Sequence, residues 1–103
     1  MLNRLQHGSA SNVTATHATA AVASKAGATG VTHAISALAV SSDKAGSICL
    51  VKDGTTTIWQ QIVGAGQYSQ VFPAGLHATT GALISVEIDG TAACKANMSV
   101  ISY

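Results

Sequence analysis

The stretch SICLVKDGTTTIWQQIV, residues 47–63, decides the fold of this chain. It holds two runs of β-forming residues on either side of the dipeptide Asp53-Gly54. Asp-Gly supplies the positive φ angles of a tight turn, so the two runs are predicted to pair as an antiparallel β-hairpin. The first run, 47–52, is apolar on both faces, which is typical of a central strand that is covered on both sides.

The chain after residue 63 continues with short strands and turns. The sequence predicts a strand over 67–72 and a turn at Pro73-Ala74-Gly75, because proline fixes φ and glycine permits a sharp bend. Asp89-Gly90 predicts a second hairpin, and the residues around it alternate between apolar and polar. The polar Ser85 and Glu87 are expected to face water. The apolar set expected to face the core comprises Ile84, Val86, Ile88, Cys94, Ala96, Met98 and Val100.

The chain before residue 47 is less regular. Residues 31–40 are predicted to form a strand in which a one-residue bulge near Ser36 keeps the apolar side chains on one face. The Ala- and Thr-rich stretch 13–24 is predicted to be an edge strand. Residues 1–12 are polar and lack strand alternation, so they are predicted to form an extended arm that lies on another surface.

The number and spacing of these strands indicate the fold class. About eight short strands, separated by regularly spaced turn signals, are typical of a β-sandwich. A chain of 103 residues has room for one domain. The sequence therefore predicts an all-β protein, an antiparallel, jelly-roll-like β-sandwich formed by residues 13–103 with residues 1–12 as its extended N-terminal arm.

The composition predicts that the surface of the protein associates with other protein chains. Charged residues make up 9% of the chain, compared with about 25% in an average soluble domain. Much of the surface must then consist of small polar and apolar residues, which protect poorly against association. We expect neighbouring chains to cover a large part of it. The alternative is a neutral monomer coated with serine and threonine.

The charge excludes two classes of partner. The formal net charge is +1, and the basic residues are scattered singly, at Arg4, Lys25, Lys44, Lys52 and Lys95. Because nucleic acids and anionic membranes are bound by clusters of basic residues, neither is an expected partner. The N-terminal residues lack the continuous apolar core of a secretory signal, so the chain is expected to be made in a cytoplasm.

Residues with catalytic chemistry are few. The acidic residues are Asp43, Asp53, Glu87 and Asp89. Two of them belong to predicted turns, and no serine lies in a Gly-x-Ser-x-Gly elbow, so we expect a non-enzyme without a cofactor. The four histidines lack metal-binding spacing and are expected to form local hydrogen bonds. One alternative is a histidine on a three-fold axis that binds a metal or an anion.

The cysteines and aromatic residues leave alternatives open. Cys49 and Cys94 lie in apolar runs and are expected to be buried thiols, with a disulfide as the alternative. Trp59 is expected to be either a core residue or the anchor of an interface. Trp59 and Tyr68 each lie beside glutamines, so either aromatic side chain is also a candidate for binding a sugar.

The order of turns in residues 46–103 resembles a known family. The features that carry the resemblance are Lys52-Asp53-Gly54-Thr55, the strand with Trp59, Gly64-Ala65-Gly66, Val71-Phe72-Pro73-Ala74-Gly75-Leu76, Thr80-Gly81-Ala82-Leu83 and the final hairpin ending in Tyr103. This order is similar to that of small β-sandwich virion proteins of tailed bacteriophages, above all the capsid cement (decoration) proteins. The resemblance covers a little over half of the chain. It consists of turn-forming residues and includes no functional residues.

The resemblance implies a function. A cement protein sits on the outer capsid of the virion as a homo-oligomer, often a trimer, and clamps neighbouring copies of the major capsid protein. The first 45 residues do not share the resemblance, so the capsid contacts are a separate hypothesis that places them on the arm, at Leu2, Arg4 and Leu5. The alternatives are a carbohydrate- or receptor-binding module of a tail or head fibre that recognises a host surface glycan, and a head–tail or tail component.

Overall fold

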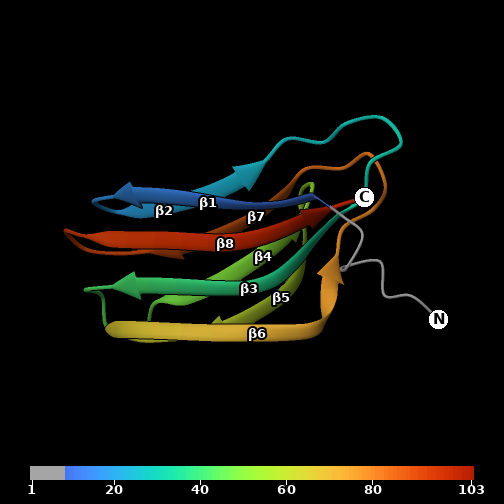
Figure 1. Ribbon diagram of the computed structural model, residues 1–103. Helices are drawn as coiled ribbons and strands as arrows, with labels where there is room; N and C mark the ends of the chain where they lie inside the picture. The colour runs from blue at the N-terminus through green and yellow to red at the C-terminus, as the bar shows by residue number, and fades with distance from the viewer. Residues whose placement is uncertain (1–8) are drawn as a thin grey trace.

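Two antiparallel four-stranded sheets pack face to face in the computed structural model, which describes residues 9–103 (Figure 1). The strands are β1 (Ser9–His17), β2 (Ala20–Lys25), β3 (His33–Ser42), β4 (Ile48–Asp53), β5 (Thr56–Ile62), β6 (Gly66–His77), β7 (Ile84–Asp89) and β8 (Cys94–Ser102). The strand order is β1-β8-β3-β6 in the first sheet, called sheet A here, and β2-β7-β4-β5 in the second, called sheet B. This interleaved order is that of a jelly roll, so the predicted fold class is confirmed.

The core lies between the two sheets. The predicted inward residues of β7 and β8 are all buried, which confirms the alternation in this part of the sequence. Ser85 is an exception to the predicted outward set, since it is only 4% exposed. Its small side chain lies on a central strand, opposite Ser24 of β2 and Lys52 of β4, and little of it reaches water.

The hairpin around Asp53-Gly54 is present, with its turn one residue later than predicted. β4 and β5 pair antiparallel, and Asp53 pairs with Thr56, so the two turn residues are Gly54 and Thr55. Only Gly54 has a positive φ, of 63°, which is the requirement at the first position of a type II′ turn. Asp53 ends β4, and its Oδ2 accepts hydrogen bonds from the amide and hydroxyl groups of Thr79 at 3.0 and 2.7 Å.

The second predicted hairpin, at Asp89-Gly90, is wrong. β7 belongs to sheet B and β8 to sheet A, so this connection crosses from one sheet to the other. Gly90 has no positive φ, and its role is steric. A Cβ atom at this position would lie 2.9 Å from Cβ of Cys94 and 3.2 Å from the carbonyl oxygen of Ala18.

The bend at Pro73-Ala74-Gly75 does not separate two strands as predicted, although Gly75 has the expected positive φ, of 79°. These residues lie within β6, the edge strand of sheet A. Val71 pairs with Ala37 and Leu76 with Ile35, so residues 72–75 form a wide bulge in the strand. A proline is tolerated here because an edge strand needs hydrogen-bond donors on one side only. The bulge predicted near Ser36 on the neighbouring β3 is confirmed.

The N-terminal part of the described chain differs from the prediction in two ways. The stretch 13–24 contributes to two edge strands, β1 and β2, which lie in different sheets. β1 begins at Ser9, so residues 9–12 of the expected arm are part of sheet A and pair with β8. Backbone pairing along a sheet edge requires no apolar alternation, which explains why residues 9–12 carry no strand pattern. The proposed contact residues Leu2, Arg4 and Leu5 lie outside the described residues.

Among the described residues, no helix is long and apolar enough to span a membrane.

Candidate binding surfaces

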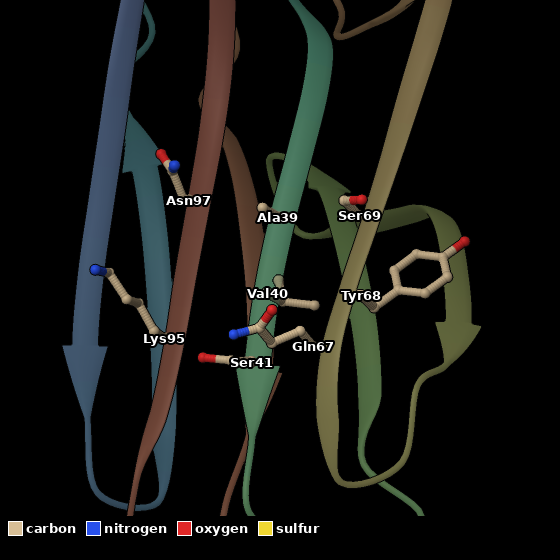
Figure 2. Close-up of a pocket in the computed structure, with 8 residues that line it drawn as sticks. All are labelled: Ala39, Val40, Ser41, Gln67, Tyr68, Ser69, Lys95 and Asn97. Atoms are coloured by element: carbon tan, nitrogen blue, oxygen red, sulfur yellow. The ribbon is translucent and has the colours of Figure 1, made fainter.

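A groove runs along β3 on the outer face of sheet A. Figure 2 shows its larger part, a depression of about 490 Å³ with Ala39 at its floor. Asn97 of β8 and Ser69 of β6 both pair with Ala39 and stand on its two sides. Lys95 and Gln67 flank Ser41 in the same way. The groove exists because β3 presents small side chains to solvent between two strands that carry longer ones at Lys95, Asn97 and Gln67.

A second depression, of about 210 Å³, extends the groove toward the other end of β3. It shares Ala39, Ser69 and Asn97 with the first and adds Ala37, Val71 and Ser99. Polar and apolar groups line the larger depression in about equal share, apolar groups dominate the smaller one, and Lys95 is the one charged residue among the lining side chains. The groove can therefore offer hydrogen bonds to an extended, polar and uncharged or weakly anionic ligand.

Three of the four aromatic residues form a cluster on one lateral side of the sandwich. The ring of Trp59 stacks on Tyr68 with centroids 6.4 Å apart, and meets Phe72 edge-on at 5.5 Å. Trp59 belongs to β5, an edge of sheet B, and the other two belong to β6, an edge of sheet A. All three rings pack against the core and are partly buried. The cluster closes the space between the sheet edges, and in Figure 2 the ring of Tyr68 points away from the groove floor.

The outer face of sheet B carries exposed apolar side chains. Ile62 is 69% exposed, Val22 45% and Ile48 41%. Ile48 and Ile62 lie opposite each other on β4 and β5, and Leu50 lies further along β4. The strand at 47–52 is central in its sheet, as predicted, but it is covered on one face only, because Ser47, Cys49 and Val51 are buried while Ile48 is exposed.

The charged residues on this face are paired within the chain. Lys52 lies 2.6 Å from Glu87, and Lys44 lies 2.7 Å from Asp89. The Lys44 hydrogen bond, together with the backbone N–H of Ile48 at 3.1 Å, lowers the pKa of the Asp89 carboxyl. This face is consequently apolar and electrically neutral around Ile48 and Ile62.

The remaining acidic residues have structural partners as well. Asp43 accepts hydrogen bonds from the backbone N–H groups of Thr91 and Ala92, both at 2.8 Å. These bonds, that of Thr91 foremost, lower the pKa of Asp43. With Asp53 bound to Thr79 and the other two acids in ion pairs, each of the four carboxylates holds a loop or a strand pair in place.

The histidines in the described part of the chain bind local partners. Buried His33 lies between the Ser102 hydroxyl and the Ala26 carbonyl oxygen, at 2.6 and 2.8 Å. His77 contacts the Tyr103 hydroxyl at 2.7 Å, and His17 accepts the amide of Thr19. No group of three His, Cys, Asp or Glu side chains with metal-binding geometry occurs among residues 9–103.

Both cysteines are buried and free. Burial raises the pKa of the Cys49 thiol to about 12, and it also raises the pKa of Cys94. A thiol with so high a pKa carries almost no thiolate at neutral pH and is a poor nucleophile. The open alternative of a disulfide is not realised in this structure, and both side chains serve as small apolar core residues.

Sequence reasoning missed the groove and the sheet B face. It singled out Trp59 and Tyr68, which the structure brings together in one cluster. The groove residues Asn97 and Gln67 are ordinary strand residues whose proximity depends on the pairing of β6 and β8 with β3. The one available signal was the series of small outward residues in β3, which indicates a shallow strip between longer neighbours.

Comparisons with known proteins identify a fold and no family. No family model matches the chain, and no curated protein matches it. Similar solved structures include Bacillus endospore appendages, which are disulfide-linked pili (TM-score 0.50, 13% identity, covering 92% of this chain and 86% of that one). They also include a CBM36-1 domain of a multidomain xylanase from the hindgut metagenome of Trinervitermes trinervoides (0.46, 13%, 91% and 95%). A third is the periplasmic inhibitor of g-type lysozyme, PliG, from Aeromonas hydrophila (0.44, 9%, 95% and 90%). At these identities the likeness concerns the β-sandwich fold alone.

Proposed function

We propose that this chain is a non-enzymatic structural protein of a virion, a decoration protein that binds the outer capsid as a homo-oligomer and stabilises the shell. The observation that carries the proposal is the nature of the two outer sheet faces. One is lined by small polar side chains with a single lysine, and the other exposes Ile48 and Ile62 between ion pairs that are already formed. A partner that covers the sheet B face leaves no charge of these ion pairs unpaired, and a partner that covers sheet A has only Lys95 to satisfy.

The proposed mechanism is mass action. A protein that binds the assembled shell and not its separated subunits stabilises the shell by the free energy of that binding. Several weak contacts per oligomer reinforce one another, because the first contact holds the others at high effective concentration. The partner in this proposal is the major capsid protein, and the location is the outer surface of the virion after synthesis in the host cytoplasm.

The position of the protein on particles tests the proposal. An antibody raised against the purified chain is applied, with a gold label, to particles pelleted from the cells that produce the chain. Label spread over the whole shell supports the decoration role. Label confined to one vertex or to fibres supports a head–tail, tail or fibre component instead, and particles without label overturn the assignment to a virion.

A carbohydrate-binding module is the second candidate, favoured by the polar groove on sheet A. Its amides and hydroxyls are the groups that hydrogen-bond a sugar, while Trp59 and Tyr68 pack against each other and the core. A glycan array probed with the wild-type chain and with the double variant Gln67→Ala, Asn97→Ala tests this candidate. Glycan binding that the double variant loses supports it, and a wild-type chain that binds no glycan overturns it.

A further inference from the structure

Strand β5 is an open sheet edge whose second half is protected by neither a charge nor a proline. It is the last strand of sheet B, and within the described chain no strand pairs with its outer side. Its sequence, TTIWQQI, contains no charged residue, no proline and no glycine. Proteins commonly protect such edges with charges, prolines or bulges, because unpaired N–H and C=O groups recruit other strands. By contrast β6, on the same lateral side, carries Pro73 and the wide bulge at 72–75.

The part of β5 that can accept another strand is its second half. A register shift against β4 leaves Ile58 as an extra residue, while Trp59–Ile62 pair regularly with Val51–Ile48. Gln60, Gln61 and Ile62 are exposed in this segment. Ile62, at 69%, has the highest exposure among the large apolar side chains of the described chain. The unpaired backbone groups of β5 and the exposed side chain of Ile62 thus lie in the same segment. One added strand would form hydrogen bonds with these backbone groups and cover the side chain.

We propose that β5 pairs antiparallel with β5 of a second copy about a two-fold axis, which joins the two B sheets into one. The inference deepens the proposed function, because it names the surface through which the copies of the proposed homo-oligomer meet. It makes the basic unit a dimer, in place of the trimer that the family resemblance implies.

The charge and symmetry of β5 identify the partner as a second copy. Two-fold pairing places each residue of the strand near the same strand of its partner, so a charged strand would meet its own charge. β5 has none, and of the charged residues on the neighbouring β4, Lys52 is ion-paired with Glu87 and Asp53 is hydrogen-bonded to Thr79. Pairing also places the Ile48–Ile62 pairs of the two copies on the same face of one continuous sheet. The joined sheet then presents an apolar strip twice as long as that of one copy.

Single lysine substitutions test the proposal. Light scattering across a wide concentration range gives the mass of the wild-type chain and of the variants Ile62→Lys and Gln61→Lys. The matched control is Val71→Lys, because Val71 is 64% exposed and lies on β6. We expect a wild-type dimer, an unchanged dimer in the control, and dissociation constants raised roughly tenfold or more in both β5 variants, because the axis introduces each lysine twice.

The other outcomes overturn the proposal. A wild-type monomer or trimer at every concentration contradicts the two-fold contact, as does a Val71→Lys variant that dissociates like Ile62→Lys. Circular dichroism confirms that each variant is folded, and Gln61→Lys provides a second β5 variant if Ile62→Lys is not. The antibody labelling of particles is independent of these masses. Labelled shells with a trimeric protein would overturn the β5 contact alone, and unlabelled particles with a β5 dimer would overturn the decoration role alone.

Discussion

The Nδ1 atom of His33 lies 2.6 Å from the hydroxyl oxygen of Ser102, so the first residue of β3 is tied to the last residue of β8. The other ring nitrogen, Nε2, donates to the carbonyl oxygen of Ala26 at 2.8 Å, because a carbonyl oxygen can only accept. The ring therefore joins three segments that are distant in sequence, and it does so while only 2% exposed.

Replacing His33 by alanine is expected to destabilise the domain. The change leaves a cavity and removes the partners of the Ser102 hydroxyl and the Ala26 carbonyl group, which costs about 2–4 kcal/mol. Urea denaturation followed by circular dichroism measures the free energy of unfolding. The control is His17→Ala, since His17 is exposed and accepts one local hydrogen bond. Equal effects of the two substitutions would contradict the structural role of His33.

Gly90→Ala is expected to destabilise the domain through lack of space. Its new Cβ would lie 2.9 Å from the Cβ of Cys94 and 3.1 Å from the carbonyl oxygen of Ala93, so the connection between the sheets must shift. Overpacking of this kind costs about 1–3 kcal/mol. The comparison is Gly54→Asn, where a Cβ meets nothing within 4 Å and asparagine tolerates the positive φ. A loss of stability in Gly54→Asn that exceeds the loss in Gly90→Ala would refute this distinction.

Stability is expected to fall as the pH drops below the usual range of a carboxyl group. Hydrogen bonds lower the pKa of Asp43 and Asp89 in the folded chain, from a reference value of 3.8. A lowered pKa contributes stability that is complete above the pKa of the unfolded chain and is lost as the pH falls through that of the folded chain. Denaturation in urea at pH 7 and pH 3 should show a smaller pH-dependent loss for Asp43→Asn than for the wild type. The control Lys95→Gln, on the open face of sheet A, should show the same pH-dependent loss of stability as the wild type. An equally large loss in Asp43→Asn would exclude a contribution from the Asp43 carboxyl.

The sequence predicted those features of the fold that depend on local chemistry. The hairpin between β4 and β5 and the alternating core residues of β7 and β8 follow from turn residues and side-chain period, which are readable in one segment. The hairpin prediction at Asp89-Gly90 failed because turn-forming residues do not indicate which sheet the next strand joins. The prediction that Pro73 lies outside a strand failed because an edge strand can contain a proline. That β6 is an edge strand is set by its pairing with β3, which is far away in the sequence.

The candidate surfaces were less accessible to prediction for the same reason. The groove requires Asn97, Ala39 and Ser69 to lie side by side, and this register arises from three strands that are separated by long stretches of chain. The Trp59 cluster likewise depends on β5 and β6 lying at matching edges of different sheets. Composition did indicate correctly that few charges would remain on the outer faces.

The contact between Trp59 and Phe72 is expected to contribute to the joining of the two sheets. Their rings meet edge-on at 5.5 Å, a geometry worth about 0.5–1.5 kcal/mol beyond the area that is buried. A double-mutant cycle with Trp59→Leu and Phe72→Leu isolates this coupling in urea denaturation. The same cycle with Trp59→Leu and Leu76→Ala is the control, because Leu76 packs against the core and has no aromatic ring of its own. A coupling within experimental error of zero would show that the two rings only fill space.

Truncation separates the role of the arm from that of β1. Deleting residues 1–8 is expected to leave the free energy of unfolding unchanged to within about 0.5 kcal/mol, since the deletion ends before the first strand pair. Deleting residues 1–12 also removes the pairing of Ser9–Asn12 with β8 and the 2.8 Å hydrogen bond from Ser99 to Asn12, so this variant should be less stable.

Attachment to particles then tests the contact residues Leu2, Arg4 and Leu5. If the arm holds the chain on the capsid, the protein without residues 1–8 should fold normally and fail to label particles that the full chain labels. Normal labelling by this truncated protein would assign attachment to the sheet faces, because those are the surfaces that it retains. Of these, the strip around Ile48 and Ile62 is the stronger candidate, since its apolar side chains gain most from removal from water. The variant Ile48→Lys in the truncated background would then abolish the remaining attachment.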